Sequence, residues 1–234
     1  MKFKRLFVFL FFFLFCMTCC SVFAQIKYVK VSLVGDYTCG KTCIWKRLFG
    51  EGFNPNERGS DKFTYRNIIK EDGNNILSLN IWDTAGADRF YDKVIDFVED
   101  SNFIFIVHDL HQRFNGDAKT YLSRIYNDIH RRAPQAKILL VGSKYDLRHR
   151  NITNDAEQIK LVQTVAEAIP CDYTYTSAKE DNDPGIERLL NYIIEQSRNM
   201  NLPTVSPRIV IPILTPPPAP TTTTTESKGI CNIL

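Results

Sequence analysis

The chain has 234 residues and a formal net charge of +3 at pH 7. This length suits one globular domain of ordinary size with appendages, and the small charge, without a basic block, gives no indication of a nucleic-acid partner. Seven scattered cysteines, an odd number, do not form a disulfide framework, so the globular part is typical of a reducing compartment.

Residues 1–25 form an apolar N-terminal segment that differs from the rest of the chain. A basic start, an unbroken apolar run and small residues before Gln25 are the three parts of a secretory signal peptide. The apolar run is also nearly long enough to span a bilayer as an anchor. A third interpretation starts translation at Met17, which leaves Cys19 and Cys20 near the terminus as candidates for acylation. The sequence alone does not choose among the three.

The most informative stretch follows, between a predicted strand at Val29–Val34 and a predicted helix at Cys43–Phe49. It fits the pattern G-x-x-x-x-G-K-T, in which glycines let the backbone wrap around phosphate oxygens and the start of the helix adds a positive dipole. The lysine reaches the outer phosphates, and the threonine hydroxyl is placed to bind Mg²⁺. The pattern therefore predicts a phosphate-binding loop. Its residues are Gly35, Asp36, Tyr37, Thr38, Cys39, Gly40, Lys41 and Thr42, followed by Cys43.

The rest of the domain, which we place at residues 26–199, alternates strand and helix patterns. A polar loop covers Glu51–Ser60, and a strand pair follows around Glu71–Asn74, a sequence typical of a hairpin turn. Strands are predicted at Lys62–Ile69, Ile76–Trp82, Phe103–Val107, Ile138–Val141 and Asp172–Thr176. Helices are predicted at about Phe90–Val98, Asp117–Arg131, Asp155–Ala168 and Pro184–Gln196. This order predicts an α/β fold, in which a mostly parallel sheet has helices on both faces.

Residues 200–234 are rich in proline and threonine and are predicted to form a flexible tail. The tail ends in Cys231-Asn232-Ile233-Leu234, a prenylation box whose terminal leucine favours geranylgeranyl, although Asn232 fits it imperfectly. One lipid chain binds a membrane only marginally, so we expect a second anchor in the N-terminal apolar segment. The expected location is the cytoplasmic face of a membrane, and the alternative is the secretory route if residues 1–24 act as a signal peptide.

Polar residues follow the later strands, at the edge where open α/β sheets bind ligands. The Asp146 carboxylate can accept hydrogen bonds from the N1 and N2 edge of guanine, a donor pair that adenine lacks, and the Ala178 N–H can meet the guanine O6. Asp83 ends a predicted strand, where it would hold Mg²⁺ through water, and the Gly86 N–H would meet the γ-phosphate. The two base-reading segments contribute Ser143, Lys144 and Asp146, and Ser177, Ala178 and Lys179.

The segments GDYTCGKT, WDTAG, SKYD and TSAK, in this order and at these distances, resemble those of the Ras superfamily of small GTPases. The resemblance covers about Lys27–Arg198 and implies a P-loop NTPase fold with a six-stranded, mostly parallel sheet. It also implies binding of GTP or GDP with Mg²⁺. Counting from Lys41, the guanine-stacking aromatic residue of the family falls on Phe53, and its Mg²⁺-binding switch hydroxyl falls on Ser60, with Thr64 as the alternative. The implied metal ligands are Thr42, Ser60 and Asp83.

The resemblance further implies two mobile switch loops and the partners that bind them. Effectors, exchange factors and GTPase-activating proteins would contact residues near 53–65 and 83–99. The subfamily features are mixed, because Asp100-Ser101-Asn102 before an apolar strand is similar to Rab proteins and the prenylation box at Cys231 is similar to Rho proteins. The distance from Asp146 to Ser177 is too short for the extra helix of Rho proteins.

Three positions depart from the family pattern. Ser143 replaces the usual asparagine, but Rho-type members have a similar small hydroxyl residue, so base selectivity is expected to survive. Tyr37 stands where the loop residue is usually small, and its ring would lie over the γ-phosphate region and block an arginine finger. Ala87 replaces the glutamine that orients the attacking water, so the catalytic positions are Lys41, Gly86 and the altered Ala87. In this enzyme class an incoming arginine adds roughly 10³–10⁵ in rate.

Neither Tyr37 nor Ala87 touches the binding chemistry, so the departures threaten turnover and not affinity. The leading interpretation is a small GTP-binding switch with slow hydrolysis, in signal transduction or membrane traffic. One alternative is a GTP-loaded binding scaffold with no meaningful hydrolysis. Another is a secreted or luminal protein that retains only the fold.

Overall fold

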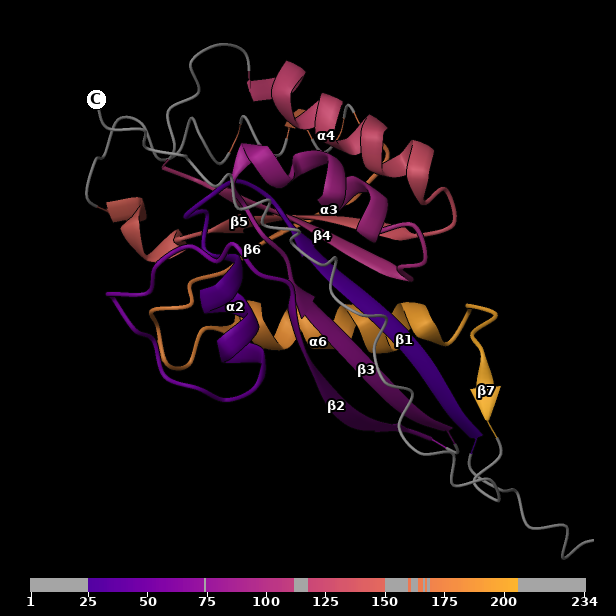
Figure 1. Ribbon diagram of the computed structural model, residues 1–234. Coiled ribbons are helices and arrows are strands. Elements are labelled where there is room, and N and C mark those ends of the chain that lie inside the picture. The colour runs from indigo at the N-terminus through magenta and orange to yellow at the C-terminus, as the bar shows by residue number, and fades with distance from the viewer. Residues whose placement is uncertain are drawn as a thin grey trace, which may run out of the picture.

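Six strands form one sheet in the order β2-β3-β1-β4-β5-β6 (Figure 1). The strands are β1 (Gln25–Val34), β2 (Thr64–Asp72), β3 (Asn75–Asp83), β4 (Phe103–Asp109), β5 (Lys137–Ser143) and β6 (Asp172–Tyr175). Among these six, β2 at one edge runs antiparallel to β3, and the other neighbours are parallel. The predicted six-stranded, mostly parallel sheet is therefore confirmed. A seventh strand, β7 (Thr204–Val205), adds a short antiparallel pair with β1.

The computed structural model describes residues 25–205, except for residue 74 and residues 112–117, 150–159, 161–163, 166 and 168. The N-terminal apolar segment, the prenylation box at Cys231 and most of the helix predicted at Asp155–Ala168 therefore lie outside the described residues. None of the helices in the described part of the chain has the length and apolar character that a membrane crossing requires.

The two faces of the sheet carry separate apolar cores. Phe103, Phe105 and Val107 of β4 belong to one core, and Ile104 and Ile106 belong to the other, because successive side chains of a strand point to opposite faces. All five side chains are buried. This is the pattern of a central parallel strand that is covered on both sides, and it explains the continuous apolar run in the sequence.

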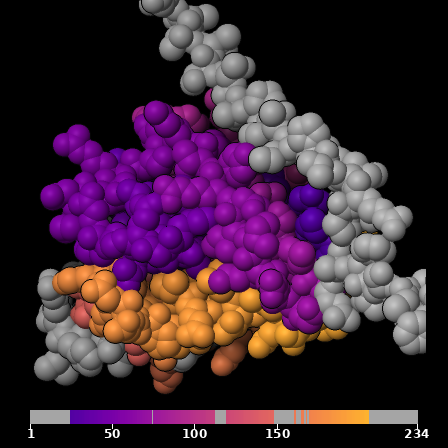
Figure 2. Space-filling view, turned by 90° about the horizontal axis from the view of Figure 1, so that it is seen from below, coloured from indigo at the N-terminus to yellow at the C-terminus, as the bar shows by residue number. Residues whose placement is uncertain are grey.

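Helices cover both faces of the sheet, as predicted (Figure 1). They are α2 (Lys41–Leu48), α3 (Tyr91–Phe97), α4 (Ala118–Arg132) and α6 (Pro184–Ser197). α2 and α6 pack on the core that contains Phe103, and α3 and α4 pack on the core that contains Ile104. Figure 2 shows α6 lying along residues of the N-terminal half of the domain. Arg198, directly after α6, forms a salt bridge of 2.8 Å with Asp72 at the end of β2.

The hairpin between β2 and β3 is tighter than the sequence suggested. Glu71 pairs with Ile76 and Asp72 pairs with Asn75, so residues 73 and 74 alone connect the two strands. Gly73 has a φ of 59°, in the left-handed region that two-residue hairpin turns need. β2 therefore continues to Asp72, three residues beyond the predicted end at Ile69.

The domain also extends beyond residue 199, where the sequence analysis ended it. Leu202 is only 6% exposed and belongs to the core beneath α2 and α6. Thr204 then pairs with Lys27 near the start of β1. Since β4 pairs with β1 only over Val31–Val34, the first residues of β1 are open to β7 on that side.

We predict that Leu202→Ala lowers the free energy of unfolding by about 2–4 kcal/mol, because it removes a buried leucine side chain. Ile69→Ala is the control, since Ile69 is 58% exposed on the edge strand and should change stability by less than about 0.5 kcal/mol. Urea unfolding of both variants measures the difference. Equal effects would show that the segment after residue 199 is not part of the core.

Candidate functional site

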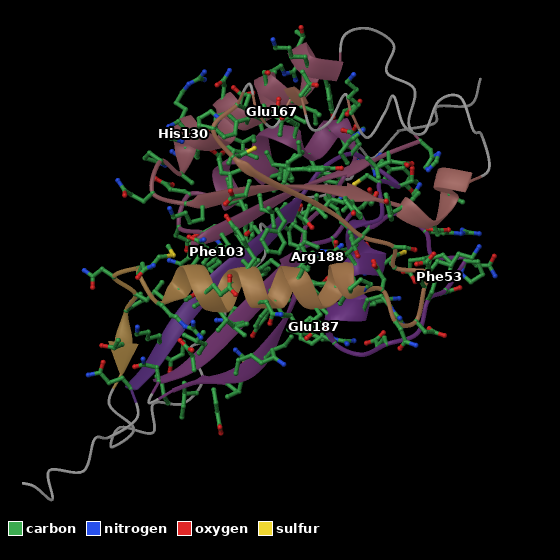
Figure 3. The ribbon with its side chains drawn as sticks, turned by 180° about the vertical axis from the view of Figure 1, so that it is seen from behind. Phe53, Phe103, His130, Glu167, Glu187 and Arg188 are labelled. Atoms are coloured by element: carbon green, nitrogen blue, oxygen red, sulfur yellow. The ribbon has the colours of Figure 1, made fainter. Side chains whose placement is uncertain are left out.

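The loops after β1, β3, β5 and β6 meet at one end of the sheet around a cleft of about 420 Å³. The carboxyl ends of parallel strands meet at this edge, which is the usual ligand site of open α/β folds. Figure 3 shows Phe53 at this end of the domain, opposite to β7. The predicted site residues that line the cleft are Tyr37, Thr38, Gly40, Lys41, Thr42, Cys43, Phe53, Ser60, Gly86, Ser143, Lys144, Asp146, Ala178 and Lys179.

The remaining predicted site residues lie beneath or beside the cleft. Those that are buried and absent from its lining are Cys39, Asp83 and Ser177. A second cavity of about 270 Å³ adjoins α3 and α4 and shares Gly86 with the cleft, and its lining includes Gly35, Asp36 and Ala87. Most of the predicted phosphate-loop residues therefore line the cleft, whereas Gly35 and Asp36 line the second cavity together with Ala87, the position of the missing glutamine.

Lys41 lies where the loop after β1, which contains Gly35, approaches the loop after β3, which contains Gly86. Its Nζ donates hydrogen bonds to the carbonyl oxygens of Gly35 at 2.9 Å and Asp36 at 2.8 Å. Gly86 lies directly against this amine, because a Cβ built on Gly86 would be 2.4 Å from Nζ and 2.7 Å from the Asp36 oxygen. The fold thus brings the lysine ammonium and the Gly86 backbone to one point, where both can face the same phosphate group.

The Thr42 hydroxyl donates a hydrogen bond of 2.7 Å to the Asp83 carboxylate. Asp83 is 1% exposed, and within the described residues its Oδ1 has no hydrogen-bond partner. Burial raises the pKa of Asp83 to about 6, against the opposing effects of the Thr42 hydrogen bond and the Lys41 charge. A hydroxyl and a buried carboxylate with an oxygen to spare are hard oxygen donors, so these residues fit Mg²⁺.

Ser60 and Thr64, the two candidates for the switch hydroxyl, occupy different places. Ser60 lines the cleft, and its Oγ forms hydrogen bonds of 3.1 Å with the backbone N–H and carbonyl of Lys62. Thr64 pairs with Asp83 in the β2–β3 ladder and is exposed outside the cleft lining. The position of Ser60 on the cleft wall favours it over Thr64.

The loops after β5 and β6 join at the other end of the cleft. Asp146 lines this end, and its Oδ1 accepts a hydrogen bond of 2.8 Å from the Ser177 hydroxyl. Lys179 Nζ lies 3.9 Å from the other oxygen of Asp146. Ala178 lines the cleft beside them. An acceptor carboxylate and the Ala178 backbone therefore lie side by side on the cleft wall.

Comparison with known proteins agrees with this arrangement. Residues 30–199 match the sequence model of the Ras family. The chain belongs to the Ras family. It is 25% identical over 158 residues to the Ras-related protein SEC4 of Saccharomyces cerevisiae, a match that covers 66% of this chain and 69% of that protein.

Two further relatives carry Rab names. The Ras-related protein Rab-4 of Dictyostelium discoideum is 27% identical over 136 residues, which cover 58% of this chain and 65% of the relative. Rab-like protein 2A of Mus musculus is 24% identical over 188 residues, which cover 72% of this chain and 82% of the relative. Proteins of this family are small GTPases that generally bind guanine nucleotides with Mg²⁺.

The unusual serine of this Ras-family site has a clear structural role. The Ser143 hydroxyl donates to the Cys39 carbonyl at 2.5 Å and lies 3.1 Å from the His108 carbonyl. It thereby connects the phosphate-binding loop with β5 and β4. Lys144 follows with a φ of 58°, and its Nζ donates to Asp109 Oδ2 at 2.7 Å. The Ser143 hydroxyl therefore links the end of β5 to the loop after β1.

Tyr37 contacts the loop between α2 and β2. A Cβ built on Gly59 would be 2.2 Å from the Tyr37 ring, so the ring lies flat against the backbone of Gly59. Both residues line the cleft, and Tyr37 is 47% exposed. The same loop is tied to α2 by a salt bridge of 2.6 Å between Lys46 and Glu57. Tyr37 thus connects the loop after β1 with the loop between α2 and β2 on the cleft wall.

Ala87 precedes a 3₁₀ turn at Asp88–Phe90. Its methyl group supplies no hydrogen-bonding atom to the second cavity. The polar groups of that cavity include the Asp36 carboxylate, which accepts a hydrogen bond from the Tyr121 hydroxyl of α4. Asp36, which the sequence placed in the phosphate loop, therefore directs its side chain toward α4.

Several supporting residues of the site were missed by sequence reasoning. They are Asp109, which holds Lys144, Glu57, which ties the switch loop to α2, and Asp183, which holds the loop after β6. Asp183 did leave a signal, since an aspartate directly before Pro184 is typical of a helix N-cap. The partners of Asp109 and Glu57 come from other elements, so no local pattern revealed them.

His108 gives the site a predictable pH dependence. It is buried in β4, and burial lowers its pKa to about 4, although Asp109 and Asp36 act in the opposite direction. Because the folded-state pKa lies below the ordinary value of 6.5, stability is present above that value and is lost as the pH falls toward 4.

We predict that wild-type stability falls by about 2 kcal/mol more than that of His108→Gln between pH 7 and pH 5. The carboxylates titrate in both proteins, so the difference between them isolates His108. Chemical unfolding at the two pH values measures it. His130→Gln, at an exposed position, should keep the wild-type dependence, and parallel curves for wild type and His108→Gln would contradict the prediction.

Proposed function

We propose that this Ras-family protein is a small GTP-binding switch that hydrolyses GTP slowly. One observation supports the proposal most strongly. The residue types expected to bind the phosphates, Mg²⁺ and guanine are present, whereas Ala87 stands where the family has its catalytic glutamine. Lys41, Thr42 and Asp146 line the cleft, and Asp83 is buried beneath it against Thr42. At the position that would orient the attacking water, the chain offers a methyl group.

In this proposal the backbone N–H groups of the phosphate loop and Lys41 hold the outer phosphates. Thr42 and Asp83 would hold Mg²⁺, which would supply positive charge to neutralise the phosphate oxygens. Ser60 adds its hydroxyl when the γ-phosphate is present, while Asp146 and the Ala178 N–H read guanine. The nucleotide state then reaches partners through residues near 53–65 and 83–99, where effectors, exchange factors and GTPase-activating proteins would bind.

Tyr37 supports the slow-turnover part of the proposal. Its ring rests on Gly59 at the mouth of the cleft, on the path by which an arginine of another protein would approach the phosphates. Stimulation by such an arginine requires direct contact with the transferred phosphate. Both the intrinsic and the stimulated routes to hydrolysis are thus weakened, while the contacts that bind nucleotide are retained.

We predict that Ala87→Gln raises the single-turnover rate of GTP hydrolysis by at least about tenfold, because the amide can orient the attacking water. Ala87→Leu is the matched control, since it adds similar bulk without a polar group and should leave the rate at the wild-type level. Phosphate release from preloaded protein measures all three rates.

A wild-type rate typical of glutamine-bearing relatives would contradict this prediction, as would an equal gain in both variants. Phosphate release measured under multiple-turnover conditions distinguishes the slow switch from the alternative function, a GTP-loaded binding scaffold. A scaffold without meaningful hydrolysis releases far less than one equivalent of phosphate. A slow switch continues to release phosphate beyond one equivalent when an exchange factor allows nucleotide turnover in the presence of Mg²⁺.

The Rab and Rab-like names of the relatives support a role in membrane traffic. We propose a location on the cytoplasmic face of a membrane, through prenylation of Cys231 and the N-terminal apolar segment. Mass spectrometry of the native N-terminus tests the alternative. A terminus at Gln25 would indicate cleavage of a signal peptide and favour a secreted or luminal protein that retains only the fold.

We predict that Cys231→Ser and deletion of residues 1–24 each reduce the membrane-bound fraction, and that the double variant is released almost completely. One lipid chain alone binds marginally, so each anchor depends on the other. Fractionation of cells that express the four proteins provides the measurement. Unchanged attachment after deletion of residues 1–24 would rule out the second anchor.

A further inference from the structure

The carboxylate of Asp183 accepts hydrogen bonds from two parts of the chain, the start of α6 and the residues after β6. Its Oδ1 accepts a hydrogen bond of 3.0 Å from the Gly185 N–H, and so caps the N-terminus of α6. Its Oδ2 accepts a hydrogen bond of 2.6 Å from the Thr176 hydroxyl and another from the Ser177 N–H. One side chain therefore joins the first turn of α6 to the two residues that follow β6.

These two residues are fully buried, so their hydrogen bonds cannot be replaced by water. Thr176 and Ser177 are each 0% exposed. The Ser177 hydroxyl donates to Asp146 Oδ1 at 2.8 Å and accepts from the N–H of Lys179 at 3.2 Å. A chain of hydrogen bonds thus runs from Asp183 through Ser177 to the carboxylate that faces the cleft.

The packing of α6 leaves this chain little freedom. A Cβ built on Gly185 would be 2.6 Å from the Thr176 Cβ and 2.6 Å from the Tyr175 carbonyl oxygen. Arg188, labelled on α6 in Figure 3, donates to the same carbonyl at 3.0 Å. The first turn of α6 therefore lies directly on the end of β6, and a shift of the cap would move the loop.

The opposite side of the loop is held by α2. Arg47 donates to the Glu180 carbonyl at 2.9 Å and contacts the Asp181 carboxylate at 3.2 Å. Arg47 thus holds the far end of the loop, whereas Asp183 holds the residues next to Asp146 and Ala178. We therefore expect the orientation of the Asp146 carboxylate to depend more on Asp183 than on Arg47.

We propose that Asp183 is a positioning residue for guanine recognition, which acts by fixing Thr176 and Ser177 so that Asp146 and the Ala178 N–H face the base. The inference rests on the proposed function, because it assigns to Asp146 the role of reading guanine. Asp183 does not line the cleft. Its effect is therefore on the geometry of the base contact and not on the nucleotide directly.

The variant Asp183→Ser separates the two tasks of the carboxylate. Serine is as good an N-cap as aspartate, so the cap of α6 is kept, but its single oxygen cannot also hold Thr176 and Ser177. The affinity for GDP and for IDP is measured with the full-length chain in the presence of Mg²⁺. IDP lacks the 2-amino group of guanine, so the ratio of the two affinities reports the contact with Asp146.

We expect Asp183→Ser to lower the ratio of GDP affinity to IDP affinity by about tenfold, the size of one well-placed hydrogen bond. In the background of Asp146→Ala the same substitution should leave the ratio unchanged, because the group through which Asp183 acts is absent. Glu187→Gln is the matched control, since Glu187 lies in the first turn of α6 and is exposed. It should not change the ratio.

If Asp183→Ser does not fold, Thr176→Val removes one of the two loop hydrogen bonds while the cap of α6 stays intact, and it should lower the ratio in the same direction. An equal loss of affinity for GDP and IDP would overturn the proposal and assign Asp183 a structural role alone. A ratio that falls equally with and without Asp146 would also overturn it. Failure of the proposed function is distinguishable, because the wild-type protein itself would then show no preference for GDP over IDP.

Discussion

A buried ammonium and a buried carboxylate lie near each other at the floor of the cleft, and the rest of the site depends on them. Lys41 and Asp83 are 5% and 1% exposed, and the lysine charge opposes the burial that raises the pKa of Asp83. Burying such charges is costly unless opposite charges and hydrogen bonds meet them. Two backbone carbonyls accept hydrogen bonds from the Lys41 ammonium, and the Thr42 hydroxyl donates a hydrogen bond to one oxygen of Asp83. A polyphosphate with a divalent cation is the ligand that complements both charges.

Ala87 lies apart from most of the residues that are expected to bind nucleotide. The contacts expected to bind nucleotide gather in the cleft, whereas Ala87 faces the adjoining cavity between α3 and α4. Substitution at Ala87 therefore leaves the charged floor of the cleft intact. Tyr37 belongs to the predicted phosphate loop, and its exposed ring extends toward Gly59 on the cleft wall. In our proposal, a Ras-family domain with Tyr37 and Ala87 keeps its affinity for nucleotide but hydrolyses GTP slowly.

Features with a local cause were predictable from the sequence. The apolar runs of β1, β4 and β5 predicted buried parallel strands because both faces of these strands are covered, and the phosphate loop was predicted because its chemistry is contiguous in the chain. Other features depend on contacts between distant segments. Leu202 is a single apolar residue before a proline- and threonine-rich tail, so composition alone did not reveal its burial. Asp183 and Asp109 support the base-binding loops across strands, and only the packing of β4, β6 and α6 brings them to their partners.

Recognition of guanine by Asp146, with the phosphates held by the loop that contains Lys41, is the central claim of this account. The most direct test is a titration of the purified protein with GDP and with ADP in the presence of Mg²⁺. The account predicts that GDP binds at least about a hundredfold more tightly, because adenine leaves the buried polar groups around Asp146 unpaired. Equal affinity for the two nucleotides would contradict it.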